Sequence, residues 1–235
     1  MSSNSSTPTE RFDDVVREFI DFINAQVGVF MDALAGFEGH YTRVERQIHR
    51  ANRPTSVRNA ENGEQVVVWV SYEDPTKPDI IHNRIIRAED YLSINARGGA
   101  NEQQHARAII VFLYTAWELD YRPRLAAAKG VDLNELKSDV MGDLRIIRHT
   151  ILHAKSTLSQ EDHRKLKKLG DVFQSGLLFS VTNENMHQIF VLAKQDCGRL
   201  MSEWLKLGDS SPLTSPIKDI AIQRVNPTEN KRLLP

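Results

Sequence analysis

The sequence predicts an all-α protein, an antiparallel helical bundle with a small insertion that bears a β-hairpin. Apolar residues recur every three or four positions through most of the chain, which is the period of an amphipathic helix. Only one stretch, residues 66–72, is a β-type run. At 235 residues the chain is long enough for one full core. Helices packed around a single core therefore account for the pattern.

The first helix is expected from Glu10 to about Ala51, after a polar segment, residues 1–9, that we expect to be a disordered tail. Its apolar positions form one long stripe, which we interpret as core rather than as a dimer seam. The stripe consists of Phe12, Val16, Phe19, Ile23, Val27, Phe30, Leu34, Phe37, Tyr41, Val44 and Ile48.

Residues 53–99 interrupt the helical rhythm and form the expected insertion. Asn62-Gly63 is a turn signal, and the strand-type run 66–72 follows it. Pro75 and Pro78 are expected to end the strand, and a short helix from Ile85 to Ile94 to follow.

A well-buried helix is expected between Asn101 and Lys129, with Pro123 disturbing or ending it. Glu118 precedes Arg122 by four residues, a favourable order for an ion pair on a helix. Gly130 should open a turn.

The helix that organises the chain is expected next, with Asp132 or Asn134 as its cap. Its apolar stripe is Leu133, Leu136, Val140, Leu144, Ile147 and Ile151.

The remaining helices are expected at 159–169 and at about 183–207, followed by an extended tail, 208–235. The helical domain thus covers residues 10–207.

Residues 141–170 carry seven cations against three anions, a net +4 in a chain whose total is −1. Such a basic patch on an acidic body can steer a polyanion, although a charged loop rim is an equal alternative.

The sequence predicts a cytoplasmic protein without a membrane segment. The N-terminus is polar, no apolar run is long enough to span a membrane, and Cys197 is the single cysteine.

The organising helix carries an unusual polar face. Arg145, His149 and His153 lie opposite its apolar stripe, and Arg148 lies on the border. A histidine can accept a proton near neutral pH, and an arginine can stabilise negative charge on a phosphate. RNA cleavage needs both.

Two alternatives remain open from the residues alone. His149 and His153 could ligate a metal, but the Glu of H-E-x-x-H is absent and no third ligand is evident. The polar face could also simply form hydrogen bonds within a helix interface.

The segment Arg148-His149-Thr150-Ile151-Leu152-His153 resembles the R-x4-6-H signature of the HEPN superfamily, with a polar residue directly after the arginine. Gly142-Asp143-Leu144-Arg145 and Trp117-Glu118 to Arg122-Pro123 are similar to an HEPN-like group of bacterial proteins. The resemblance covers roughly residues 100–206 and leaves out the insertion and the C-terminal tail.

The resemblance implies a helical homodimer in which two motifs form one composite, metal-independent ribonuclease site. Arg148 and His153 would be the catalytic pair, with His149 as the polar residue assisting them. Arg145, Asp143, Glu118 and Lys155 would support the site. Lys155 occupies the place of a tyrosine that antitoxins of some HEPN toxins modify, so that form of control is not expected.

The sequence thus leads to an endoribonuclease of a toxin or phage-defence system, acting on RNA without cofactor or metal. A regulatory or antitoxin protein is an expected further partner. The alternatives are a non-catalytic module that binds RNA, nucleotide or protein, and a purely structural helical dimer. The other histidines, at 40, 49, 82, 105, 163 and 187, match no motif and are expected at the surface or in packing.

Overall fold

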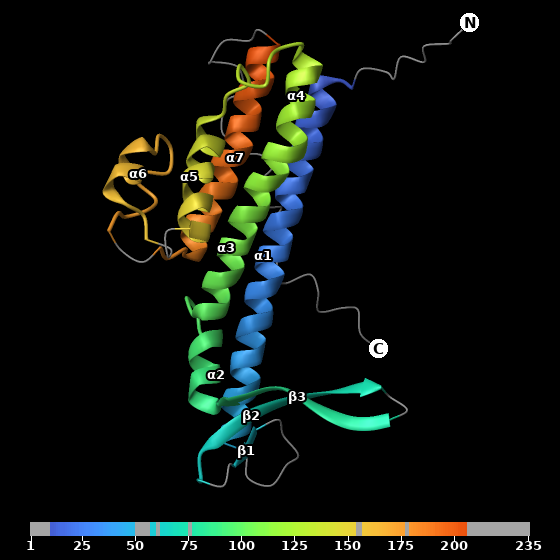
Figure 1. Cartoon of the computed structure of the whole chain (residues 1–235), viewed down its shortest axis with the longest axis vertical. Helices are drawn as coiled ribbons and strands as arrows, with labels where there is room; N and C mark the ends of the chain where they lie inside the picture. Colours follow the sequence, from blue (N-terminus) through green and yellow to red (C-terminus); the bar gives the residue numbers. More distant parts are fainter. Residues whose placement is uncertain are drawn as a thin grey trace, which may run out of the picture.

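Four long helices lie side by side and alternate in direction (Figure 1). They are α1 (Phe12–Ile48), α3 (Ala100–Ala116), α5 (Asp139–His153) and α7 (Asn183–Trp204). This computed structural model describes residues 10–49, 57–59, 62–74, 77–153, 157–176 and 179–205. The predicted all-α antiparallel bundle with a small β insertion is confirmed. The predicted tails at 1–9 and 208–235 lie outside the described residues.

The core forms where α1 meets the other helices of the bundle. Phe12, Val16, Phe19, Ile23 and Phe30 of the predicted α1 stripe are fully buried. The stripe residues that follow, from Leu34 to Tyr41, are only half-buried. The N-terminal part of α1 therefore packs into the main core, whereas Val44 near its C-terminus is buried in a second, smaller cluster with Val67, Ala88 and Tyr91.

The insertion is a three-stranded antiparallel sheet in the order β1-β2-β3, followed by a short helix. Its strands are β1 (Val57–Asn59), β2 (Gln65–Asp74) and β3 (Lys77–Arg87), and α2 spans Ala88–Asn95. The predicted turn at Asn62-Gly63 joins β1 to β2, with Gly63 at a positive φ of 82°.

Two details of the predicted insertion were wrong. The helix begins at Ala88 rather than Ile85, because Ile85, Ile86 and Arg87 pair with β2 and so remain in the sheet. β2 ends at Asp74, as predicted, and Pro75 lies outside the described residues. The second error is Pro78, which lies near the start of a further strand, β3, a position where proline is tolerated.

Pro123 was predicted to disturb or end the helix; the helix is disturbed just before Pro123 and does not end there. After α3 the chain makes one π-helical turn, η1 (Trp117–Tyr121), and continues as α4 (Arg122–Lys129). Pro123 is accommodated at the first turn of α4, where its missing N–H costs least. Gly130 then ends the helix with φ 71°, as the predicted turn requires.

α5 begins six residues later than the predicted stripe, which started at Leu133. Neither Asp132 nor Asn134 caps it; the hydroxyl of Ser138 accepts a hydrogen bond from the Met141 N–H at 3.0 Å. The segment 133–138 is instead a loop, and its Leu133 and Leu136 carbonyls accept hydrogen bonds from the Arg122 side chain.

Residues 157–176, here called the α6 segment, stand beside α5 (Figure 1). They contain the short helix α6 (Gln160–Lys165), which is shorter than the helix predicted at 159–169. Leu158, Leu169 and Phe173 anchor the segment in the core. α7 follows with a capping box formed by Thr182 and Asn185. Its apolar residues Met186, Phe190, Ala193, Cys197 and Leu200, three or four positions apart, are buried.

Among the described helices, α1 alone has the length and apolar composition that could span a membrane, and it lies near the N-terminus. By length and composition alone α1 departs from the expected lack of such a run, and the absence of a membrane segment stays a prediction. Core helices of soluble proteins and signal sequences have the same properties, and α1 contributes Phe12, Phe19 and Phe30 to the core.

The buried face of α5 supports a stability prediction. Leu144 is fully buried, whereas Leu152 on the same helix is 48% exposed. Leu144→Ala should lower the free energy of unfolding by about 3 kcal/mol through lost burial and a residual cavity. Leu152→Ala should change it by only about 0.5 kcal/mol. Urea denaturation measures both, and equal losses would contradict this packing.

Candidate functional site

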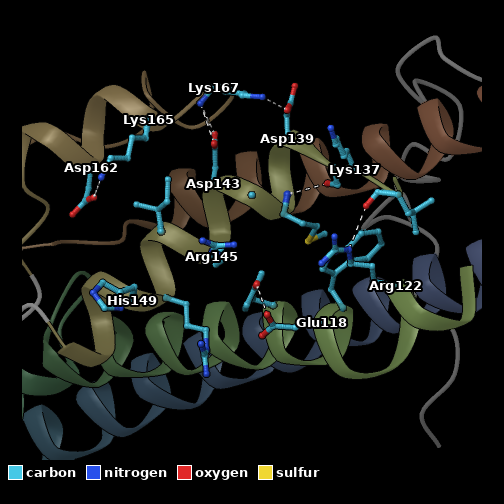
Figure 2. Close-up of a pocket in the computed structure, with 18 residues that line it drawn as sticks. Glu118, Arg122, Lys137, Asp139, Asp143, Arg145, His149, Asp162, Lys165 and Lys167 are labelled. Carbon is cyan, nitrogen blue, oxygen red and sulfur yellow. Dashed lines mark hydrogen bonds and ion pairs between the residues drawn. The ribbon is translucent and has the colours of Figure 1, made fainter. Parts of the chain in front are cut away.

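A cleft of about 780 Å³ runs along α5, with α3 and η1 on one side and the α6 segment on the other (Figure 2). Six permanent cations and four acidic residues line it, so it is net positive even with neutral histidine. The cations are Arg122, Lys137, Arg145, Arg148, Lys165 and Lys167, and the acids are Glu118, Asp139, Asp143 and Asp162. Four of these cations belong to the basic patch predicted at 141–170.

The motif residues of α5 divide between the cleft and the outer surface. Arg145, Arg148 and His149 line the cleft. His153, as described, is exposed and does not line it, but its ring lies 5.0 Å from the His149 ring, centroid to centroid. One chain therefore brings Arg148 and His149 to the cleft and leaves His153 outside it.

Arg148 is held by an aromatic ring rather than by a carboxylate. Its guanidinium carbon lies 5.7 Å from the centre of the Tyr114 ring, and its Nε is buried without a hydrogen-bond partner among the described residues. An arginine that is not neutralised by an acid keeps its hydrogen-bonding capacity for an anion.

Tyr114 joins Arg148 to Glu118. The Tyr114 hydroxyl donates a 2.8 Å hydrogen bond to Glu118 Oε1. Burial, followed by the hydrogen bond and charge of Glu118, raises the pKa of Tyr114 to about 12, so the phenol stays protonated and keeps donating at neutral pH. Tyr114 was missed in the sequence because it lies in a nearly continuous apolar run; its spacing of four before Glu118 was the available signal.

The predicted ion pair between Glu118 and Arg122 is not found among the described residues. The Glu118 carboxylate instead accepts a hydrogen bond from the Tyr114 hydroxyl. Arg122 instead donates from Nε to the Leu136 carbonyl at 3.3 Å and from Nη2 to the Leu133 carbonyl at 2.9 Å. The π turn lies between Tyr114 and Arg122, so the α-helical i,i+4 geometry on which the ion-pair prediction relied is not present.

Two lysines of the cleft are paired with acids. Lys167 Nζ lies 2.7 Å from Asp139, and Lys165 Nζ lies 2.9 Å from both Asp162 and Glu161. The hydrogen bonds from these lysines hold the pKa of Asp139 and of Asp162 below their ordinary values. Both acids are therefore ionised at neutral pH and largely cancel the charge of their lysines.

Asp143 has a structural rather than a chemical role in this arrangement. Its side chain is buried, and its carboxylate accepts backbone N–H groups of Lys167, Lys168 and Leu169 at 2.6–3.0 Å. All the hydrogen bonds found for it come from the α6 segment, so Asp143 fixes the wall of the cleft. Lys155, the remaining predicted supporting residue, lies outside the described residues.

Within the described ranges, no three or more His, Cys, Asp or Glu side chains gather in a way that could hold a metal ion.

Two histidines outside the motif have packing roles, as predicted. His105 lies between Phe30 and Phe37, with ring centroids 6.1 and 6.2 Å away. His163 Nε2 contacts the carbonyls of Gly170 and Phe173 at 3.0 and 2.9 Å, which closes the α6 segment on itself.

Removal of the Asp143 carboxylate should loosen this wall. Asp143→Ala leaves three backbone N–H groups without their acceptor and should cost about 3 kcal/mol of unfolding free energy. Asp139→Ala, which removes an exposed ion pair with Lys167, should cost less than about 1 kcal/mol. Urea denaturation gives the energies, and amide exchange at residues 167–169 should accelerate only in Asp143→Ala. Unchanged exchange there would contradict the role of Asp143.

Comparison with known proteins adds no family: no family model, no curated protein and no solved structure matches the chain. The cleft is thus interpreted from its own residues.

Proposed function

We propose that this chain is a metal-independent endoribonuclease of HEPN type, acting as a toxin or phage-defence effector in the cytoplasm. The observation that carries the proposal is the cleft along α5. It gathers Arg145, Arg148 and His149, and neither arginine has a carboxylate partner among the described residues. A phosphodiester is an anion that would fill this position.

In the proposed reaction the 2′-oxygen of a ribose attacks the adjacent phosphorus, and the bond from phosphorus to the 5′-oxygen breaks. His153 takes the proton of the 2′-hydroxyl, and Arg148 stabilises the charge on the phosphorane-like transition state. His149 assists as a polar partner beside His153. The products are a 2′,3′-cyclic phosphate and a 5′-hydroxyl, after a proton returns to the leaving oxygen.

The placement of the two proposed catalytic residues supports a site shared by two copies. Arg148 lines the cleft, while His153 is exposed one helical turn beyond His149 and does not line the cleft. If two α5 helices meet across a two-fold axis, His153 of one copy can approach the cleft of the other. Gly142 is exposed, with open space where a Cβ would lie, which suits the close approach of a second helix.

One observation favours a second candidate, a non-catalytic module that binds RNA or nucleotide. Arg148 already contacts Tyr114, and the nearby histidine of the cleft, His149, is only a supporting residue. A cleft of this kind can hold a phosphate without cleaving its ester. Binding without cleavage by the wild type would select this alternative.

The chemistry is tested with purified protein and a labelled RNA. Cleavage should persist in EDTA and leave a 2′,3′-cyclic phosphate. Arg148→Ala and His153→Ala should each reduce the rate by at least about 100-fold, the range lost with a catalytic acid, base or charge stabiliser. His187→Ala, an exposed histidine on α7, is the matched control and should retain the rate. Activity that is lost in EDTA and restored by zinc or manganese would overturn the mechanism.

The shared site is tested by Gly142→Gln, which adds a neutral side chain where the second helix should approach. Gly142 also lines the cleft, so the oligomeric state is the reading that decides. Glutamine favours a helix more than glycine does, so stability should not fall. The variant should sediment as a monomer and lose cleavage together with dimerisation. A wild type that is fully active as a monomer at the assay concentration would show that one chain suffices.

A further inference from the structure

The cleft extends well beyond the motif residues. Figure 2 shows His149 at one end, Arg145 between, and Lys137 and Arg122 at the other end. From Asp139 to Arg148 the helix advances nine residues, which at the rise of an α-helix is about 14 Å. A phosphate bound by Arg145 and Arg148 would therefore occupy one end only.

The cations at the far end differ from the paired lysines of the same cleft. Lys165 and Lys167 each have a carboxylate within 3 Å. Arg122 and Lys137 have no carboxylate partner among the described residues, and the Lys137 side chain is exposed. The uncompensated charge of the cleft therefore lies in two groups: Arg145 with Arg148, and Arg122 with Lys137.

Arg122 and the backbone of Lys137 are held in place by hydrogen bonds in which neutral carbonyls are the acceptors, so the positive charges of the two side chains are not compensated. Arg122 donates to two loop carbonyls, those of Leu133 and Leu136, which are neutral acceptors. Arg199 of α7 donates to the carbonyl of Lys137 at 2.9 Å, while its own Nε lies 2.8 Å from Asp196. Arginines from two different helices thus fix the 133–137 loop, so that Lys137 extends from a rigid backbone. Nη1 of Arg122 makes no hydrogen bond to a described residue.

We propose that Arg122 and Lys137 form a second phosphate subsite, so that the cleft binds an oligonucleotide strand at two separated phosphates. The inference rests on the proposed function, because it takes the ligand at Arg145 and Arg148 to be RNA. It adds that a mononucleotide or dinucleotide reaches only the motif end, and that affinity rises when the strand is long enough to reach Lys137.

The test uses fluorescent 2′-O-methyl oligoribonucleotides, which lack the attacking hydroxyl and stay intact. Their length increases from a dinucleotide to an octanucleotide, and binding is measured by anisotropy over a range of salt. The Lys137→Ala variant should bind the octanucleotide several-fold more weakly than the wild type and should bind the dinucleotide with unchanged affinity. The slope of log affinity against log salt should fall by about 0.7, the value for one phosphate contact of a single strand. The Lys137→Glu variant should bind the octanucleotide more weakly still.

The control is Lys194→Ala, which removes the same charge from α7, where Lys194 donates to Asn24 of α1 outside the cleft. Equal effects of the two alanine variants, or an affinity that does not depend on length, would overturn the second subsite. If the wild type still cleaved RNA, the proposed function would stand. A wild type that neither binds any of the oligonucleotides nor cleaves RNA would overturn both. Lys137 is exposed and its carbonyl is unchanged in each variant, so the fold should be retained.

Discussion

The burial of the Asp143 carboxylate is the constraint on which the shape of the site depends. An unpaired carboxylate in a protein interior costs several kcal/mol, so its position is tolerated only because backbone N–H groups surround it. Those groups belong to Lys167, Lys168 and Leu169, and they come to α5 only if the α6 segment closes on itself. Leu158 and Phe173 then fill the core beneath. One side chain thus ties the wall of the cleft to the helix that carries the motif.

The cleft is built from parts of the chain that meet only in the folded state. α5 supplies Arg145, Arg148 and His149, and the loop before it supplies Lys137. The helical stretch from α3 to α4 supplies Tyr114, Glu118 and Arg122, and the α6 segment supplies Lys165 and Lys167. Lys165 and Lys167 are paired with carboxylates, whereas Arg122 donates to neutral carbonyls and Arg148 lies over the Tyr114 ring. This division decides which positive charges remain for a ligand, and it is more informative than the total charge of the region.

The helices were predictable from the sequence because burial imposes the 3.6-residue period on Phe12 to Phe30 and on Met186 to Leu200. The arginines and His149 of the motif were identified for the same reason, as polar residues opposite an apolar stripe. Tyr114, Arg122 and Lys137 were not identified as site residues, since their positions depend on contacts between segments. The start of α5 was misjudged because Leu136 is buried although it lies in a loop. Periodicity reports burial and does not report which backbone conformation achieves it.

The π turn at Trp117–Tyr121 has a consequence for how this chain can vary in length. A π turn holds one residue more than the α-helical turn it replaces, so it shifts the angular phase of all that follows by roughly 100°. Deletion of a single residue there would restore a regular helix while turning Arg122 away from the loop carbonyls it binds. Substitution of an exposed residue of this turn, such as Leu119, leaves that phase unchanged, whereas deletion of one residue changes it. We therefore expect natural insertions and deletions to avoid this turn. They should occur in segments where a change of length does not rotate the helix that follows.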